Sequence, residues 1–346
     1  MLLVCDGAIE NYDNMVTLFG LLNLPSVDEP FRFTTDIKLL RIMLGLSGGK
    51  PTFGCPYCLA QKVGGDKGDY VKGLHRTLGF CKLSNEKYVA AGSVKKDANK
   101  FYNCIKTPVD IMSGEDDTWT LAMYPPPILH IVLLGGPNDV LIALRKNYPA
   151  QYAAFEERFG YQRSEGRGGR FNGVTIREIL KTERVLEDIR SWPRVPDHVR
   201  QAVVEYFEAT WNVYLVCMKQ EVDDDHPKIF KSFREKFLTV KKVLKGVSHT
   251  VKVHCVIGIT NNLYTKYFHL YLDHLSEYMK NTQTTFAWTS DEFIETLHSR
   301  LRRFEENHSL AIRKRKNFGC ILHQQRLLTS IGLFNYENLG FLITNS

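Results

Sequence analysis

The sequence predicts an α/β fold that continues into a long, mostly helical body. Up to about residue 58, short apolar segments typical of strands alternate with segments of helical period. Beyond about residue 128, apolar side chains recur every three or four positions through one segment after another. The 346 residues are 44% hydrophobic and 24% charged, an ordinary globular composition that excludes disordered and collagen-like chains.

The first 58 residues predict the order strand, helix, strand, helix. The opening segment MLLVCDG is apolar and ends near Asp6, whereas residues 11–22 carry apolar side chains at helical spacing. Residues 31–34 alternate between aromatic and polar, which indicates a second strand, and Asp36 lies where that strand gives way to a helix. Because a carboxylate at a strand end is held rigidly, Asp6 and Asp36 are candidate ligands for a hard cation such as Mg²⁺.

The pattern loosens between about residues 59 and 128 and then becomes helical. Charged and glycine-rich segments, among them KKDANK at residues 95–100, predict solvated loops, and Pro125 to Pro127 stop any helix before them. The predicted helices that follow are 128–144, 150–159, 174–189, 197–218, 226–244, 264–280 and 290–308.

The net charge and the length of the apolar runs limit the possible partners and location of the protein. The net charge of +7 and the pI near 8.8 are mildly basic, which is compatible with a nucleic-acid partner. The N-terminal segment has no positive leader, and the apolar runs are shorter than the roughly eighteen residues of a membrane span. We therefore expect an intracellular protein with neither a signal peptide nor a membrane segment.

Two residue pairs have spacings typical of zinc sites. Cys55 and Cys58 form the one C-x-x-C motif among eight cysteines, and His269 and His274 are separated by four residues. Together they make a Cys₂His₂ ligand set, and a metal there closes a loop of roughly two hundred residues. The alternative is that the cysteines are ordinary reduced thiols and the histidines half-buried helix residues. Competing ligands that periodicity does not exclude are His249, His254 and Cys255.

Carboxylates gather again in the helix predicted near the C-terminal end. Ser290 is a natural N-cap there, and the acids in the first turns are Asp291, Glu292 and Glu295. Polynucleotidyl transfer needs acids that converge on two Mg²⁺ ions about 4 Å apart. Taken singly, each of these acids is better explained as a solvated surface charge, and only their arrangement favours a metal site.

The order of these residues carries a resemblance to a known family. The series is Asp36, Cys55, Cys58, His269, His274, Trp288, Glu295 and Arg302-Arg303-Phe304. This order resembles the catalytic region of Transib-type DDE transposases and of their domesticated relative, the catalytic subunit of the V(D)J recombinase. Leu129-His130 and the glycine-rich turn Gly168–Gly173 also resemble family motifs, so the likeness spans about residues 2–308.

The resemblance implies a fold with three parts. Residues 1–58 correspond to an incomplete RNase H-like core of the retroviral integrase kind, whose first strands and first catalytic aspartate are missing. Residues 59–286 correspond to a large, mostly helical, zinc-stapled insertion, and residues 287–346 to a C-terminal helix with a basic tail.

The resemblance also implies roles for individual residues. Asp36 corresponds to the second acid of the DDE set and Glu295 to the third, with Glu292 as the less favoured choice; Asp6 lies near an auxiliary acid. Cys55, Cys58, His269 and His274 correspond to the ligands of a structural zinc, and Mg²⁺ or Mn²⁺ is implied at Asp36 and Glu295.

The implied activity is metal-dependent DNA nicking followed by transesterification, as in transposition and recombination. The implied partner is double-stranded DNA at transposon ends, bound by a nuclear homodimer away from membranes. Because the first aspartate is expected to be missing, the alternative is a catalytically dead, zinc-stabilised DNA-binding or assembly module. A C-x-x-C thiol oxidoreductase is disfavoured, since Pro56-Tyr57 lacks the strand-to-helix setting that activates a thiolate.

Basic clusters provide candidate DNA contacts. Glycines among the arginines at residues 163–173 allow the backbone to approach phosphate closely, although a flexible connector is the favoured explanation. The basic tail fits either DNA contact or nuclear import, and a solvated charge run is its alternative. The candidate DNA-binding residues are Arg167, Arg170, Arg302, Arg303, Arg313, Lys314, Arg315 and Lys316.

Overall fold

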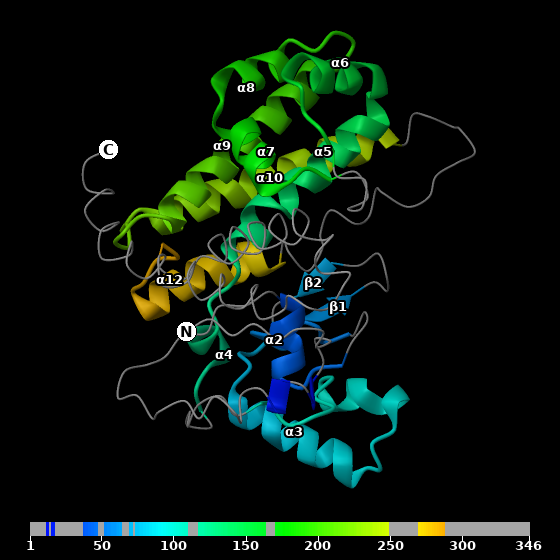
Figure 1. Ribbon diagram of the computed structural model, residues 1–346, viewed down its shortest axis with the longest axis vertical. Helices are drawn as coiled ribbons and strands as arrows, with labels where there is room; N and C mark the ends of the chain where they lie inside the picture. The colour runs from blue at the N-terminus through cyan, green and yellow to red at the C-terminus, as the bar shows by residue number, and fades with distance from the viewer. Residues whose placement is uncertain are drawn as a thin grey trace, which may run out of the picture. The chain divides into compact units, whose positions relative to one another are not determined.

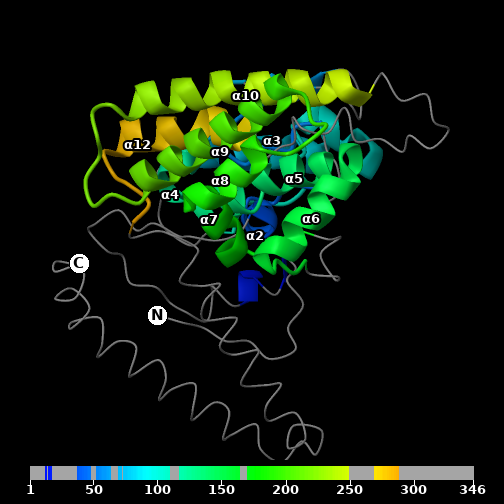
Figure 2. The same ribbon diagram turned by 90° about the horizontal axis from the view of Figure 1, so that it is seen from above.

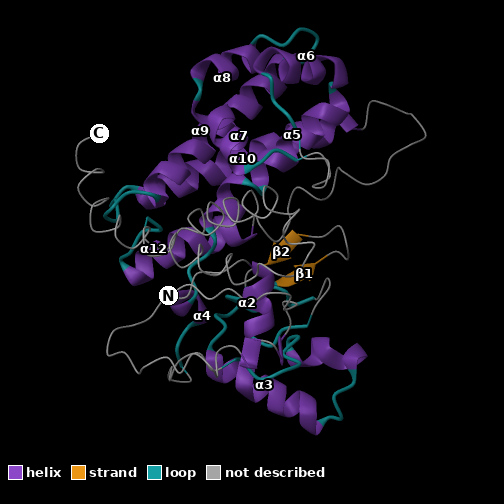
Figure 3. Ribbon diagram, in the orientation of Figure 1, coloured by secondary structure: helices purple, strands orange, loops and turns teal. Residues whose placement is uncertain are grey.

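The computed structural model describes residues 12–13, 15–17, 37–47, 52–63, 69–71, 73–109, 117–163, 170–248 and 269–287. All of them belong to the unit Glu10–Asp291. Helices dominate this part of the chain, and its strands form one two-stranded sheet (Figure 3). The prediction of a mostly helical body is confirmed. An RNase H-like α/β core is not shown, because the strands predicted before residue 36 lie outside the described residues.

The first described segments tie the N-terminal part of this unit to residues 103–109. Residues 12–13 and 15–17 are helical, as predicted, and α2 spans Ile37–Met43. Gly45 follows α2 with φ +66, and a Cβ there would lie 2.0 Å from the carbonyl oxygen of Lys106. Only glycine fits, because both the left-handed backbone and the close approach exclude a side chain. The Gly45 carbonyl in turn accepts hydrogen bonds from the amides of Ile105 and Lys106.

A short hairpin follows the C-x-x-C motif. Strands β1 (Gln61–Val63) and β2 (Asp69–Val71) pair antiparallel, and the pairing continues where the Leu59 amide donates to the Leu74 carbonyl over 2.8 Å. A Cβ on Gly73 would lie 2.3 Å from the carbonyl oxygen of Leu59, so the two chains approach closely at this position. The hairpin brings residues 73–77 back beside the two cysteines.

The region where the sequence pattern loosens contains helices, and the loop predicted for the KKDANK run is wrong. Helix α3 spans Leu78–Ala90, capped by the Thr77 hydroxyl, and η2 (Lys95–Phe101) is a 3₁₀ helix over the KKDANK run. Periodicity missed α3 because its apolar residues lie on several sides, with Leu83 and Val89 more than half exposed while Ser84 and Asn85 are buried. A short α4 (Thr120–Met123) follows.

The observed helices of this body lie where the sequence predicts helices, but two of the predicted helices are interrupted. Its elements are η3 (Leu129–Leu133, π-helical), α5 (Gly136–Asn147), α6 (Pro149–Phe159), α7 (Gly173–Lys181), α8 (Glu183–Arg190), α9 (Asp197–Cys217) and α10 (His226–Ser248). The predicted helix 128–144 is interrupted at Gly135, before Pro137 opens α5, and the predicted helix 174–189 breaks at Thr182, whose backbone is extended.

The two longest helices, α9 and α10, pack along their lengths (Figures 1 and 2). Their contact is aromatic: the ring of Tyr206 lies 5.7 Å from that of Phe233 and 6.2 Å from that of Phe237, and all three side chains are buried. No helix in the described part of the chain combines the length and apolarity needed to cross a bilayer.

The last described elements are η5 (Leu270–Leu275, π-helical) and α12 (Ser276–Thr282), which contact η3, α4 and α10. After α12 the Phe286 amide donates to the Cys217 carbonyl over 2.8 Å, so this segment is attached to the end of α9. Its buried face, which includes Tyr278 and Phe286, belongs to the same core as the helical body.

Candidate metal centre

Cys55 and Cys58 lie in a loop whose backbone is fixed by hydrogen bonds. The Cys55 carbonyl accepts from Arg76 Nε at 3.2 Å, and the Tyr57 carbonyl accepts from the Arg76 amide at 2.9 Å and from Trp119 Nε1 at 3.2 Å. The hydroxyl of Thr120 lies 2.9 Å from the Pro56 carbonyl. Each carbonyl from residue 55 to residue 57 therefore has a donor, and both thiols are held in place.

The two histidines meet because the helix that carries them is π-helical. In an α-helix, five residues turn about 500°, which leaves side chains five apart about 140° from each other. The i to i+5 repeat of a π-helix instead brings such residues to the same side, and Leu270–Leu275 adopts it. The Nε2 atoms of His269 and His274 lie 3.3 Å apart as a result.

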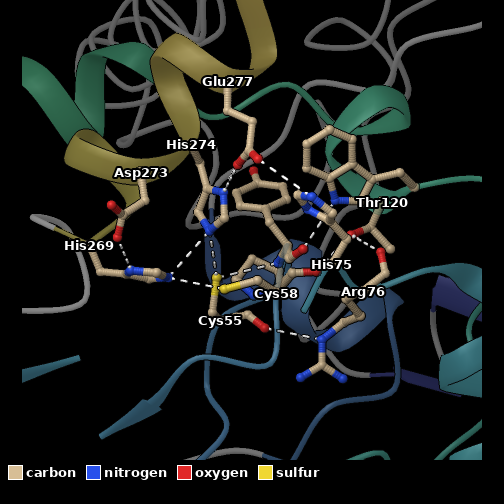
Figure 4. Close-up of polar contacts among 12 residues, drawn as sticks. Cys55, Cys58, His75, Arg76, Thr120, His269, Asp273, His274 and Glu277 are labelled. Atoms are coloured by element: carbon tan, nitrogen blue, oxygen red, sulfur yellow. Dashed lines mark hydrogen bonds and ion pairs between the residues drawn. The ribbon is translucent and has the colours of Figure 1, made fainter. Parts of the chain in front are cut away.

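The four donor atoms match a tetrahedral metal site (Figure 4). Cys55 Sγ lies 3.4 Å from His274 Nε2, and Cys58 Sγ lies 3.3 Å from His269 Nε2. Zinc bond lengths of about 2.3 Å to sulfur and 2.05 Å to nitrogen place tetrahedral nitrogens about 3.3 Å apart and sulfur about 3.5 Å from nitrogen. All four side chains are buried, and their ligand atoms lie within 4.8 Å of one another. The predicted residues thus form a buried cluster able to bind a metal ion.

Two carboxylates orient the histidines from behind. Asp273 Oδ2 lies 2.7 Å from His269 Nδ1, and Glu277 Oε2 lies 3.1 Å from His274 Nδ1 (Figure 4). Each carboxylate accepts the proton on Nδ1 and so directs Nε2 toward the metal position, which is the usual outer contact of a metal-binding histidine.

These carboxylates also reach residues of other elements. Arg234 of α10 lies 3.6 Å from Asp273 Oδ1, and His75 lies 3.6 Å from Glu277 Oε1. His75 in turn packs against the ring of Trp119, with 4.0 Å between ring centroids. The histidine segment is therefore connected both to the long helix α10 and to the hairpin beside the cysteines.

The electrostatics of the cluster favour one thiolate in the absence of metal. Hydrogen bonds from Cys55, His269 and His274 hold the pKa of Cys58 far below its usual range. Burial, followed by the contact with Cys58, raises the pKa of Cys55. Burial lowers the pKa of His269, but Asp273 and Cys58 outweigh it and raise the pKa to about 9. A metal ion replaces these protons, so its binding releases them.

A buried cation supports the cysteine loop. Arg76 is fully buried, and besides Cys55 it contacts Cys104 Sγ at 3.2 Å and Cys81 Sγ at 3.9 Å. No carboxylate among the described residues pairs with it. A hydrogen bond from Cys104, together with the charge of Arg76, lowers the pKa of Cys81 to about 7, whereas that of Cys104 is raised by Cys81. We infer that the two thiols share one negative charge that balances the guanidinium.

The structure leaves the other predicted sites unplaced. Outside the described residues lie Asp6, Asp36, Asp291, Glu292, Glu295, Arg167, Arg302, Arg303, Arg313, Lys314, Arg315 and Lys316, with the alternative ligands His249, His254 and Cys255. Arg170 is described, and its guanidinium forms a 2.6 Å ion pair with Asp139. The magnesium site and the DNA contacts therefore remain predictions.

Sequence reasoning missed Asp273, Glu277 and Arg76. The first two had a signal, since each lies three or four residues after a histidine on the same helix, where the side chains meet. Arg76 had none, because an arginine in a polar segment is ordinarily exposed. No family model matches the chain, and a search of curated proteins returned no match.

Proposed function

We propose that Cys55, Cys58, His269 and His274 bind one structural zinc ion. Two thiolates and two imidazoles form a donor set that suits zinc, and their spacing fits its tetrahedral geometry. All four positions are filled by protein side chains, which leaves none for a water or a substrate. The metal therefore has a structural role, and the chemistry of the protein is to be sought elsewhere.

We propose further that the chain is a transposase-like DNA-processing protein, with ancestral metal-dependent nicking and transesterification of DNA. The observation that supports this is the meeting of two ligand pairs that are 219 residues apart between Cys55 and His274. Asp36 precedes Cys55 by nineteen residues and Glu295 follows His274 by twenty-one. Across the metal, the chain path between these two acids shortens from about 260 residues to about 40, which lowers the loop-closure entropy of bringing them together.

The test of zinc is direct. The purified protein should contain one equivalent of zinc, and His269→Ala with His274→Ala should abolish it. His198→Ala, at an exposed histidine at the start of α9, is the matched control and should leave the zinc content unchanged. Thiols of Cys55 and Cys58 that react freely in the native protein would contradict the proposal.

The test of activity is DNA nicking and strand transfer with Mg²⁺ or Mn²⁺. Asp36→Asn and Glu295→Gln should each lower the rate of nicking and strand transfer by several orders of magnitude, because two-metal transfer depends on every anchoring acid. Glu292→Gln is the matched control and should retain activity. Equal loss in all three variants would contradict the assignment of Glu295.

A second candidate function is a catalytically dead, zinc-stabilised DNA-binding or assembly module. The observation that favours it is that the described site residues have structural roles. The metal site is closed, and the outer carboxylates and the buried arginine hold its ligands in place. This candidate predicts DNA binding or self-association by the zinc-loaded protein, with no nicking in Mg²⁺ or Mn²⁺. Nicking that Asp36→Asn abolishes would exclude it.

A further inference from the structure

Helix α10 has two faces of different chemistry. The inner face packs on α9 and buries Phe230, Phe233, Phe237, Val240 and Leu244. The outer face carries four exposed cations, Lys228, Lys231, Arg234 and Lys242, which we call the basic face. Along the helix there are seven lysines and arginines against one acid, Glu235. Figure 2 shows α10 along one edge of the helical body.

The charge of the basic face is only partly balanced within the protein. Lys236, toward α9, is paired with Glu205 at 2.7 Å, and Lys228 is paired with the exposed Asp225 at 2.6 Å. Lys231 and Lys242 have no ion-pair partner among the residues that the structure describes. They lie eleven residues apart, about three turns, so both point to the same side of the helix.

The burial of the inner face decides between partners. A basic amphipathic helix binds a membrane surface or a groove in another protein by inserting its apolar face. That face of α10 is already packed on α9, so the exposed side offers mainly charge and hydroxyls such as that of Ser232, with Leu238 as its exposed large apolar side chain. Lysines and hydroxyls are the groups that contact phosphate oxygens without regard to base sequence.

We propose that the basic face of α10 binds the phosphate backbone of duplex DNA. Lys228 to Lys242 spans about 21 Å of helix, over which duplex DNA carries about twelve phosphate charges. The duplex therefore offers more phosphates along this length than the basic face has cations. The choice of DNA over RNA rests on the proposed function, whereas the choice of a phosphate polyanion rests on α10 itself.

The metal centre holds this face in place. Asp273 bridges His269 of the metal cluster and Arg234 of the basic face, with contacts of 2.7 and 3.6 Å. The carboxylate faces both the metal ligand and the guanidinium, so it also reduces the charge that Arg234 offers to DNA. We therefore assign the larger part of the binding to Lys231 and Lys242.

The experiment measures binding of the full, zinc-loaded chain to a 30-base-pair DNA duplex over a range of salt concentrations. Lys231→Gln with Lys242→Gln removes two exposed charges without adding repulsion. The slope of log affinity against log salt should fall by about 1.8 and the affinity at 0.15 M salt by roughly 10- to 30-fold, since each phosphate contact contributes about 0.9 to that slope.

Lys146→Gln with Lys181→Gln is the matched control, because these exposed lysines lie on α5 and α7 and the net charge changes equally. Control variants as weak as the α10 variant, or an α10 variant that binds like the wild type, would overturn the inference and leave the proposed function standing. A wild-type protein that binds no duplex DNA, or prefers duplex RNA of the same length, would overturn both. Circular dichroism of each variant establishes that it is folded.

Discussion

Asp273 Oδ2 lies 2.7 Å from His269 Nδ1, on the side of the imidazole opposite the cluster of sulfur and nitrogen donors. The carboxylate accepts the proton on Nδ1, so the proton on Nε2 is the one that a metal displaces, and it also fixes the ring orientation. Glu277 does the same for His274 at 3.1 Å. Metal affinity should therefore depend on residues that are not ligands.

Replacing Asp273 by Asn should lower zinc affinity by about 10- to 100-fold, because the ring loses both its orientation and the basicity that the carboxylate supplies. Competition with a chromophoric chelator measures this affinity. Asp224→Asn, an exposed acid between α9 and α10, is the control and should have no effect. An unchanged affinity in Asp273→Asn would show that the contact does not support the metal.

Removing the metal should strongly lower the thermal stability of the protein. The ion joins residues 55 and 58 to residues 269 and 274, and structural zinc in small domains contributes about 10 to 16 kcal/mol of binding free energy that is also folding free energy. Chelation should lower Tm, and added zinc should restore it. Cys55→Ser with Cys58→Ser should start at the low Tm and respond to neither treatment; a chelator-sensitive Tm in that variant would contradict the site.

Replacing Arg76 by Met should lower both the stability and the zinc affinity. The loss removes the cation that lowers the pKa of Cys81 and the donor of the Cys55 carbonyl. Where the thiols carry the inferred charge, breaking a buried ion pair costs about 3 to 5 kcal/mol. Arg76→Lys should rescue little, because one ammonium does not reach the carbonyl and the sulfur together. Chemical denaturation measures the free energy of unfolding, and a fully stable Arg76→Met would refute the charge balance.

The pair of Asp139 and Arg170 should make stability fall as pH rises. Burial raises the pKa of Asp139 to about 6, and the 2.6 Å ion pair with Arg170 offsets this only in part. A carboxyl whose folded pKa exceeds its unfolded value of about 3.8 contributes stability below pH 4 that is lost as pH rises through 6, on the order of 3 kcal/mol.

Asp139→Asn removes this titration. The difference in unfolding free energy between wild type and variant should therefore change between pH 4 and pH 7 and then become constant. Asp224→Asn, which removes an exposed acid, should show no such change. A pH-independent difference for Asp139→Asn would show that the ion pair cancels the effect of burial, and a difference of opposite sign would show that it outweighs burial.

The metal cluster could be predicted from the sequence because its geometry is local. The two-residue gap of Cys55 and Cys58 fits the bite of a metal, and the four-residue gap of the histidines lies in the usual range, whatever the fold between them. The carboxylates behind the histidines obey the same local spacing. The π-helix that makes a gap of five positions work was not predictable, since it depends on packing rather than on residue type.

Long-range features were beyond the sequence for a different reason. Arg76 is buried only because the hairpin returns to the cysteine loop, and no sequence pattern around Arg76 predicts that burial. Helix α3 lacks an apolar stripe, since its buried side includes Ser84 and Asn85 while Leu83 and Val89 face solvent. The helices from α6 to α10 were predictable within a few residues, apart from the break at Thr182 between α7 and α8, because each presents one apolar side to the same core.

The separation of the two ligand pairs has a consequence for the protein as it is made. At about 5 to 20 residues per second, the ribosome delivers His269 between about ten and forty seconds after Cys58. Through that interval the nascent chain has two of its four ligands, and a C-x-x-C loop alone holds zinc weakly and leaves both thiols open to other metals and to oxidants. The centre is therefore completed only when the histidine segment arrives, and its yield should depend on free zinc and on reducing conditions in the cell that makes it.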